Sequence, residues 1–209
     1  MKEIDLETWP RREHFNFFGR LDYPIYNVCF ELDVTRLHAF AKRTGLSFTN
    51  TMLHVSTAAA NRVDNLKYRI RGEKVVLHEV LHPSFTCMVE GSDLFKLVTV
   101  DFDADIARFD AQTKQAVQAQ REYFPLDKLK GRDDFIFFSS LPWIAFTGLD
   151  HTVNLKRDDT IPRITWGKFQ PRAGQLMLPY NIQVNHRVVD GFHLGLFRQA
   201  LDEIMETLP

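Results

Sequence analysis

The chain has 209 residues, a formal net charge of −1 at pH 7 and a hydrophobic content of 44%. A chain of this length buries roughly 70% of its unfolded surface, which is enough for a full core. The near-neutral charge argues against nucleic acid or an anionic membrane as the main partner. No apolar run approaches the roughly 20 residues that span a bilayer, and no apolar leader is evident at the N-terminus. The two cysteines, Cys29 and Cys87, lie in apolar segments, so we expect buried free thiols in a cytoplasmic protein.

The first hundred residues are predicted to alternate short helices and strands. Pro10 suits the first turn of a short N-terminal helix. Apolar and polar residues alternate over residues 25–34, so we expect a strand with one exposed face. Gly45 suits the end of a helix over residues 35–43. A longer helix is expected from Thr49 or Asn50 to about residue 65, followed by a hairpin over residues 67–80 and strands over residues 84–90 and 94–101.

The second half continues the mixture of helices and strands. A polar helix is predicted from Asp103 to about Glu122, and a loop follows at residues 123–133. The further predicted strands cover residues 134–139, 144–154, 164–169 and 176–186. The sequence contains no internal repeat and no linker. We therefore predict one α+β domain over residues 1–209, a two-layer sandwich in which helices pack mainly on one face of a mixed sheet.

His78-Glu79-Val80-Leu81-His82 is a literal H-E-x-x-H sequence. On a helix this spacing places two zinc ligands and a general base on one face. Here it follows a β-rich segment, and Pro83 comes next, which disfavours helical geometry at His82. On a strand, at about 3.3 Å per residue, His78 and His82 would lie too far apart to share one ion. We therefore expect no metal site at this sequence.

The most informative stretch of the chain is residues 178–193. Apolar residues alternate up to His186, which predicts a half-buried strand that ends in this histidine. Asp190 and Gly191 signal a turn, and Asp190 is a good N-cap for the amphipathic helix that follows. A histidine in this loop can take up and return a proton near neutral pH. The alternative is a structural core histidine beside a helix cap.

Residues 186–191, His-Arg-Val-Val-Asp-Gly, match the H-x-x-x-D-G signature of the chloramphenicol acetyltransferase family, which dihydrolipoyl acyltransferase catalytic domains share. The chain resembles the chloramphenicol enzymes nearly end to end. The other matching blocks are Trp9 with Arg11-Arg12-Glu13-His14-Phe15, Pro83 with Phe85-Thr86, Ser139 with Leu141-Pro142-Trp143, and Thr165 with Lys168-Phe169. The resemblance implies a cytoplasmic antibiotic-resistance enzyme that moves acetyl from acetyl-CoA to a small-molecule alcohol. It also implies a homotrimer with active sites between subunits, His186 coming from one subunit and much of the acceptor pocket from its neighbour.

The resemblance further implies a role for each matching residue. His186 would be the general base that takes the proton of the acceptor hydroxyl as its oxygen attacks the thioester. Ser139 would donate a hydrogen bond to the tetrahedral oxyanion, and Thr165 would help through a bound water. Asp190 would pair with Arg11 and hold the loop that aims His186. The implied contacts with coenzyme A are Trp143, Lys168 and Phe169.

The sequence departs from the family in two places. Asn185-His186 replaces the usual His-His pair, but the catalytic position is kept. Asp22, Pro24, Leu149 and His151 fall at acceptor-pocket positions that are mostly apolar in the chloramphenicol enzymes. Polar groups in an apolar pocket are costly unless they find partners, which draws attention to Asp22 and His151. The pocket positions that retain apolar or aromatic character are Phe17, Phe18, Tyr26, Phe95 and Val153.

Three alternatives to acetylation of chloramphenicol follow from these observations. Asp22 and His151 favour the same reaction on a different hydroxylated molecule. An acyltransferase core of a dehydrogenase complex is disfavoured, because the sequence shows neither a lipoyl domain nor a flexible linker. A non-catalytic trimeric binding protein on the same scaffold is disfavoured by the joint presence of the four residues His186, Ser139, Asp190 and Arg11.

Overall fold

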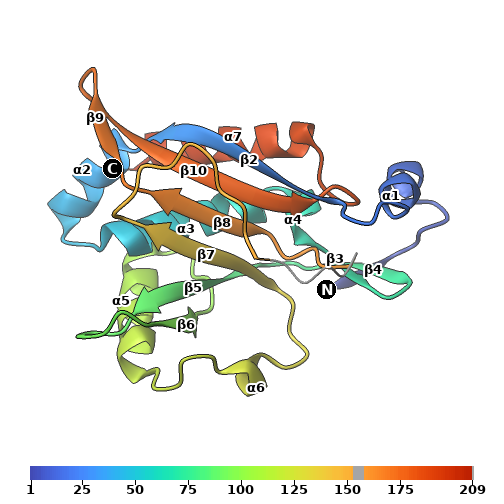
Figure 1. The fold of residues 1–209 in the computed structure, drawn as a ribbon, viewed down its shortest axis with the longest axis horizontal. Coiled ribbons are helices and arrows are strands. Elements are labelled where there is room, and N and C mark those ends of the chain that lie inside the picture. The colour runs from blue at the N-terminus through green and yellow to red at the C-terminus, as the bar shows by residue number, and fades with distance from the viewer. Residues whose placement is uncertain (153–157, 209) are drawn as a thin grey trace.

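The computed structural model describes residues 1–152 and 158–208 (Figure 1). The elements in chain order are β1 (Lys2–Ile4), α1 (Arg12–Phe18), β2 (Ile25–Asp33), α2 (Thr35–Thr44), α3 (Phe48–Asn61), α4 (Asp64–Lys67), β3 (Tyr68–Arg71), β4 (Lys74–Leu77), β5 (His82–Met88), β6 (Phe95–Thr99), α5 (Ile106–Ala119), α6 (Leu126–Leu129), β7 (Phe135–Leu141), β8 (Arg163–Gly167), β9 (Gln170–Arg172), β10 (Gln175–Asn185) and α7 (Gly191–Glu206). Most of the predicted strands and helices are confirmed within a few residues at each end.

A mixed seven-stranded sheet forms the centre of the molecule. Its strands lie in the order β2-β10-β8-β7-β5-β6, and β9 pairs with β10 beside this path. Strand β7 runs parallel to both β5 and β8, and the other pairs are antiparallel. A second sheet has the order β1-β4-β3. Figure 1 shows the coloured part of the connection that follows β7 crossing the near face of the large sheet.

The helices cover the opposite face of this sheet. The apolar residues of β10 face these helices, but the predicted exposed face is wrong, because every residue from 180 to 185 is buried. The connection from β7 to β8 contacts Asn181 and Gln183 on the other face. The Tyr180 hydroxyl donates to Ser56 Oγ on α3 at 2.9 Å, and the Tyr180 ring lies 6.3 Å from the ring of Phe197 on α7. Figure 1 shows α3, α5 and α7 together behind the strands. The predicted α+β arrangement, with helices mainly on one face of a mixed sheet, is therefore confirmed.

Two of the predicted element boundaries are wrong. Helix α3 begins at Phe48, with Ser47 as its N-cap in place of Thr49 or Asn50, because the Ser47 hydroxyl accepts the Asn50 N–H at 3.3 Å. The strand expected over residues 144–154 is absent from residues 144–152, and the rest of that range lies outside the described residues. Strand β10 is already paired with β2 and β8, so the segment bonds to its side chains instead.

The cysteine prediction holds for one residue of the pair. Both thiols are free, and Cys87 is partly buried. Cys29 is exposed, so the expectation of two buried thiols is wrong. The reason is its position, because β2 is an edge strand of the large sheet and Cys29 lies on the face away from the helices.

The H-E-x-x-H sequence runs from the end of β4 to the first residue of β5 and forms no helical turn, as predicted. His78 Nε2 lies 2.7 Å from Asp133 Oδ1, and His82 Nδ1 accepts the backbone N–H of Phe102 at 3.0 Å. Within residues 1–152 and 158–208, no cluster of three or more potential metal-binding side chains occurs. None of the helices in the described part of the chain has the length and hydrophobicity that crossing a bilayer requires.

Arg69 connects the two sheets from inside the core. Its side chain is fully buried, at 1% exposure. The guanidinium donates to four backbone carbonyls at 2.6–2.8 Å, those of Leu66, Tyr68, Asp133 and Phe135. Burial lowers the pKa of Arg69 to about 10, so the group remains charged at neutral pH. Because Tyr68 begins β3 and Phe135 begins β7, one cation fixes the small sheet to the large one.

We predict that Arg69→Met lowers the free energy of unfolding by about 3 kcal/mol, because four buried carbonyls lose a charged donor while the aliphatic packing is kept. Urea denaturation measures this change. Arg36→Met, at an exposed position of α2, is the matched control and should change stability by less than about 0.5 kcal/mol. Equal stability of the two variants would contradict the role of Arg69.

Candidate active site

His186 lies immediately after β10, where the sheet ends and the loop to α7 begins. Its backbone N–H donates to the Pro24 carbonyl at 2.7 Å, which ties the loop to the start of β2. The imidazole stacks on the Phe18 ring of α1, with centroids 3.8 Å apart and planes 10° apart. The Tyr26 ring also contacts the imidazole, with the two ring centroids 4.6 Å apart. The side chain keeps 34% exposure, so it is held in one orientation and still reachable.

Arg11 holds both ends of the loop that carries His186. Its two terminal nitrogens donate to the two carboxylate oxygens of Asp190. The same guanidinium donates to the carbonyls of His186, at 2.9 Å, and of Arg187, at 2.8 Å. The hydrogen bond from Arg11 is the main cause that lowers the pKa of Asp190. The predicted contact between Arg11 and Asp190 is therefore present, in the bidentate geometry that fixes a carboxylate most firmly.

The Asp190 carboxylate sets the tautomer of His186. Its Oδ1 lies 3.1 Å from His186 Nδ1. An ionised carboxylate only accepts hydrogen bonds, so Nδ1 carries the proton of the neutral ring. The lone pair is then on Nε2, at the opposite corner of the imidazole. This arrangement prepares Nε2 to accept a proton.

His193 has a structural part in the same loop. Its Nδ1 accepts the backbone N–H of Asp190 at 2.9 Å, which completes the start of α7. Burial is the first cause that lowers the pKa of His193. A neutral imidazole can accept this hydrogen bond, whereas a protonated ring cannot. His193 therefore stabilises the loop through a local hydrogen bond.

Ser139 lies at a different part of the sheet. It is the register partner of Thr165 on β8, and Thr165 is the partner of Asn181 on β10. The Thr86 hydroxyl on β5 donates to Ser139 Oγ at 3.2 Å. Strand order alone brings Thr86 to Ser139, because β5 is the parallel neighbour of β7. Sequence reasoning placed Thr86 in a matching block but assigned it no role.

A pocket of about 270 Å³ opens beside Ser139. It contains Phe95 and Trp143, so three of the predicted site residues meet there. The remaining lining residues are Thr86, Met88, Ser140, Leu141 and Pro142. The Phe95 and Trp143 side chains are 43% and 65% exposed. Apolar residues therefore make up most of the lining, and Thr86, Ser139 and Ser140 add hydroxyl groups to it.

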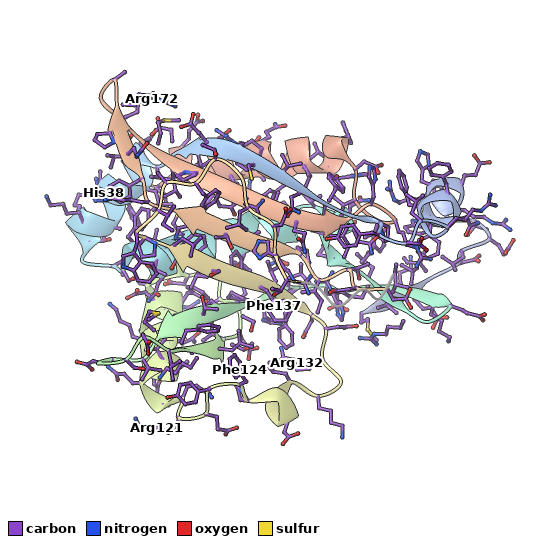
Figure 2. All side chains as sticks on the ribbon, in the orientation of Figure 1. His38, Arg121, Phe124, Arg132, Phe137 and Arg172 are labelled. Carbon is purple, nitrogen blue, oxygen red and sulfur yellow. The ribbon has the colours of Figure 1, made fainter. Side chains whose placement is uncertain are left out.

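The remaining predicted coenzyme A contacts lie near the same end of the sheet. Lys168 is exposed, and Phe169 packs against His38 and Phe48 with ring centroids 5.4 and 5.8 Å apart. Figure 2 shows His38 at the end of the molecule opposite α1. Gly167 lets the segment after β7 approach β8, since a Cβ there would lie 2.5 Å from the Ile144 carbonyl oxygen. Trp143, Lys168 and Phe169 therefore lie far from His186 in the same chain.

The strand register separates His186 from Ser139 within one chain. His186 lies five residues beyond Asn181 along β10, and Ser139 lies two strands across the sheet from Asn181. A rise of about 3.3 Å per residue and a strand spacing of about 4.8 Å give a separation of about 19 Å. A reacting carbonyl cannot contact both side chains over that distance.

The predicted acceptor-pocket residues divide in the same way. Phe17, at 60% exposure, lies on α1 together with Phe18, and Tyr26 lies beside them against His186. Asp22 is exposed in the connection from α1 to β2. Phe95 lies in the Ser139 pocket. Leu149 and His151 lie in the connection from β7 to β8. The prediction that His151 lies in a strand is wrong. Val153 lies outside the described residues.

Comparison with known proteins assigns this fold and chain to a class of acyltransferases. The structure superposes on the dihydrolipoamide acetyltransferase of Azotobacter vinelandii with a TM-score of 0.69 over 94% of this chain and 86% of that one. At 18% identity this likeness shows the fold alone. Residues 1–202 match the family model described as chloramphenicol acetyltransferase. The chain therefore belongs to the chloramphenicol acetyltransferase family, and the predicted use of acetyl-CoA as the acetyl donor is confirmed at the level of that family.

Individual relatives agree with this assignment over almost the whole chain. A chloramphenicol acetyltransferase of Bacillus pumilus is 29% identical over 208 residues, covering 98% of this chain and 93% of the relative. A solved structure of a chloramphenicol acetyltransferase has a TM-score of 0.91 and 26% identity, covering 98% of this chain and all of the other. The chain therefore shares its fold with the solved enzyme and is similar in sequence to both relatives over almost its whole length.

The Arg11–Asp190 pair predicts a pH-dependent loss of stability in Asp190→Asn. The pKa of Asp190 is lowered by folding, so its contribution is present above the ordinary carboxyl value near 4 and is lost as the pH falls through the lowered pKa. We expect the variant to lose about 1–2 kcal/mol of unfolding free energy at pH 7, and the difference to shrink below about pH 4.

Urea denaturation at a series of pH values measures this difference. Asp202→Asn is the matched control, because its partner Arg198 lies one turn away on the surface of α7 and such pairs contribute little. A difference between wild type and Asp190→Asn that stays constant from pH 7 to pH 3 would contradict the prediction.

Proposed function

We propose that this protein is an O-acetyltransferase that moves acetyl from acetyl-CoA to a hydroxyl of chloramphenicol, with His186 as the general base. The single observation that carries the proposal is the fixed tautomer of His186, whose Nδ1 faces Asp190 while Arg11 holds that carboxylate. The near-complete match to relatives named chloramphenicol acetyltransferase supports this acceptor and a role in antibiotic resistance.

The proposed reaction proceeds in one ternary complex without a covalent enzyme intermediate. His186 Nε2 takes the proton of the acceptor hydroxyl as its oxygen attacks the carbonyl carbon of the thioester. The Ser139 hydroxyl donates a hydrogen bond to the resulting oxyanion, and Thr165 assists through a bound water. The intermediate then collapses, the carbon–sulfur bond breaks, and the proton on Nε2 passes to the coenzyme A sulfur. The products are the acetyl ester and free coenzyme A.

We further propose that the active enzyme is a homotrimer and that each active site forms between two subunits. The separation of about 19 Å between His186 and Ser139 in one chain supports this, because a single chain cannot complete the site. Exposed aromatic side chains lie at both halves, Phe17 beside His186 and Trp143 beside Ser139. In a cyclic assembly the His186 half of the site on one subunit meets the Ser139 half of the site on the next subunit.

In this assembly Trp143, Lys168 and Phe169 bind coenzyme A on the subunit that supplies Ser139. We extend the proposal to residues 1–209 acting as one catalytic domain in the cytoplasm, where acetyl-CoA is available. The buried residues of both sheets and of the main helices join one hydrophobic cluster, which supports a single domain.

A second candidate acceptor is a different hydroxylated small molecule. The observation that favours it is the polar character of two predicted pocket positions, Asp22 near α1 and His151 near Thr165. Acetylation of another alcohol, with no turnover of chloramphenicol, would favour this second acceptor and leave the chemistry of His186 unchanged.

The general-base role predicts a large loss of rate in His186→Ala. We expect the rate of thiol release from acetyl-CoA, with chloramphenicol as acceptor, to fall by about 10²–10⁴-fold. His14→Ala, at an exposed position of α1, is the matched control and should keep wild-type activity. Equal rates for wild type and His186→Ala would show that another group takes the proton.

The shared active site predicts complementation between two inactive variants. His186→Ala and Ser139→Ala each remove one half of every site, and the second change should lower the rate by about 10²–10³-fold. When the two variants are unfolded together and refolded in equal amounts, about one quarter of the sites in random cyclic trimers pair an intact His186 with an intact Ser139. Activity should therefore recover to about a quarter of wild type.

The control for this experiment is the double variant mixed with His186→Ala, in which no chain carries the histidine, so no activity should return. Mixed single variants that refold into folded trimers but stay inactive would show that each chain contains its own complete site.

A further inference from the structure

A polar cluster lies on the helix-free face of the sheet, next to the Ser139 half of the site. Its centre is His151, whose Nε2 lies 2.9 Å from Asn181 Oδ1 and 3.5 Å from Thr165 Oγ1. The backbone N–H of His151 donates to Gln183 Oε1 at 3.2 Å. Thr165 is the register partner of Ser139. Because neighbouring strands lie about 4.8 Å apart, His151 is positioned about one strand away from the proposed oxyanion donor.

The contacts of Asn181 determine which nitrogen of His151 carries the proton. Asn181 Nδ2 donates to the Leu149 carbonyl at 3.1 Å and points at Cys29 Sγ at 3.2 Å. Its Oδ1 is therefore the atom that faces His151, and an amide oxygen only accepts. The Nε2–H of His151 donates to it, and the lone pair of the neutral ring is on Nδ1.

Two buried polar atoms at this cluster have no hydrogen-bond partner within the described residues. Gln183 is 1% exposed, and its Nε2 has no hydrogen-bond partner within the described structure. Asn27 Oδ1, on the neighbouring strand at the same register position, is also buried without a partner. Buried polar atoms are almost always paired. A polar ligand, or water held with it, supplies the kind of partner that this cluster lacks.

We propose that His151 is a specificity-determining residue of the acceptor site, whose Nδ1 accepts a hydrogen bond from a second donor group of the acceptor. This inference rests on the proposed acetyl transfer at Ser139 and Thr165. The acceptors that it favours are alcohols with a further hydroxyl or an amide N–H close to the acetylated hydroxyl. Alcohols whose remaining surface is apolar leave His151 Nδ1 without a partner and are disfavoured.

The charge state of the imidazole is consistent with an accepting role. Burial is the first cause that lowers the pKa of His151. The charge of Arg163 acts in the same direction, whereas the hydrogen bond with Asn181 and the charge of Asp150 oppose it. The ring is therefore neutral at pH 7. When the ring takes up a proton at lower pH, Nδ1 becomes a donor and can no longer accept a hydrogen bond.

The test compares two acceptors that differ in the second donor group. Chloramphenicol carries a second hydroxyl and an amide N–H, and 3-(4-nitrophenyl)propan-1-ol keeps the ring and the primary alcohol but lacks both. We expect wild type to prefer chloramphenicol, and His151→Leu to reduce the ratio of the two kcat/KM values by about tenfold. The KM for acetyl-CoA should stay unchanged, and His14→Leu is the control.

The pH dependence of the same ratio is a second readout. Both acceptors need His186, so its protonation cancels in the ratio. The preference of wild type for chloramphenicol should fall as the pH drops through the lowered pKa of His151, and the ratio for His151→Leu should not vary with pH.

The outcomes separate the inference from the proposed function. If wild type acetylates neither compound, the proposed function fails and the inference fails with it. If wild type acetylates chloramphenicol and His151→Leu leaves both the ratio and its pH dependence unchanged, the inference alone is wrong. A reduced ratio that no longer varies with pH supports the assignment of His151.

Discussion

The ion pair between Arg11 and Asp190 is the interaction on which the candidate active site depends. It joins the segment before α1 to the loop after β10, across 179 positions of sequence. The same guanidinium binds the His186 carbonyl, and the same carboxylate faces the His186 imidazole. Helix α1 is therefore held beside β10, which allows Phe18 to stack on His186. One partly buried charge pair thus fixes the position, orientation and tautomer of the proposed base.

The straight run of β10 imposes a second constraint on function. The strand carries His186 to one end of the sheet, while Ser139 and Thr165 lie in the row that crosses β10 at Asn181. Extended backbone cannot shorten this distance, because its rise per residue is nearly constant. The two halves are chemically complementary, one with a base and the other with hydroxyl donors beside a pocket. In the proposed trimer a second chain brings the two halves together, so assembly and catalysis are coupled in the proposed enzyme.

Local sequence patterns predicted what depends on local structure. Alternation located β10, Asp190 marked the start of α7, and the signature around His186 identified the family. The errors occurred where strand order decides the outcome. Cys29 is exposed because β2 is an edge strand, and the segment before His151 is not a strand because both sides of β10 are occupied. The contacts of Thr86 with Ser139 and of His151 with Asn181 also follow from pairing between distant strands, which no local pattern encodes.

A crystal structure with coenzyme A and chloramphenicol bound would test the proposed shared site most directly. Two distances are to be measured. The first joins His186 Nε2 of one protomer to the acceptor hydroxyl, and the second joins that hydroxyl to the coenzyme A sulfur near the partner subunit's Ser139. Our account predicts that Nε2 lies within about 3 Å of the hydroxyl, with His186 and Ser139 supplied by different chains. Ligands bound wholly within one chain, or with His186 beyond hydrogen-bonding reach of the hydroxyl, would contradict it.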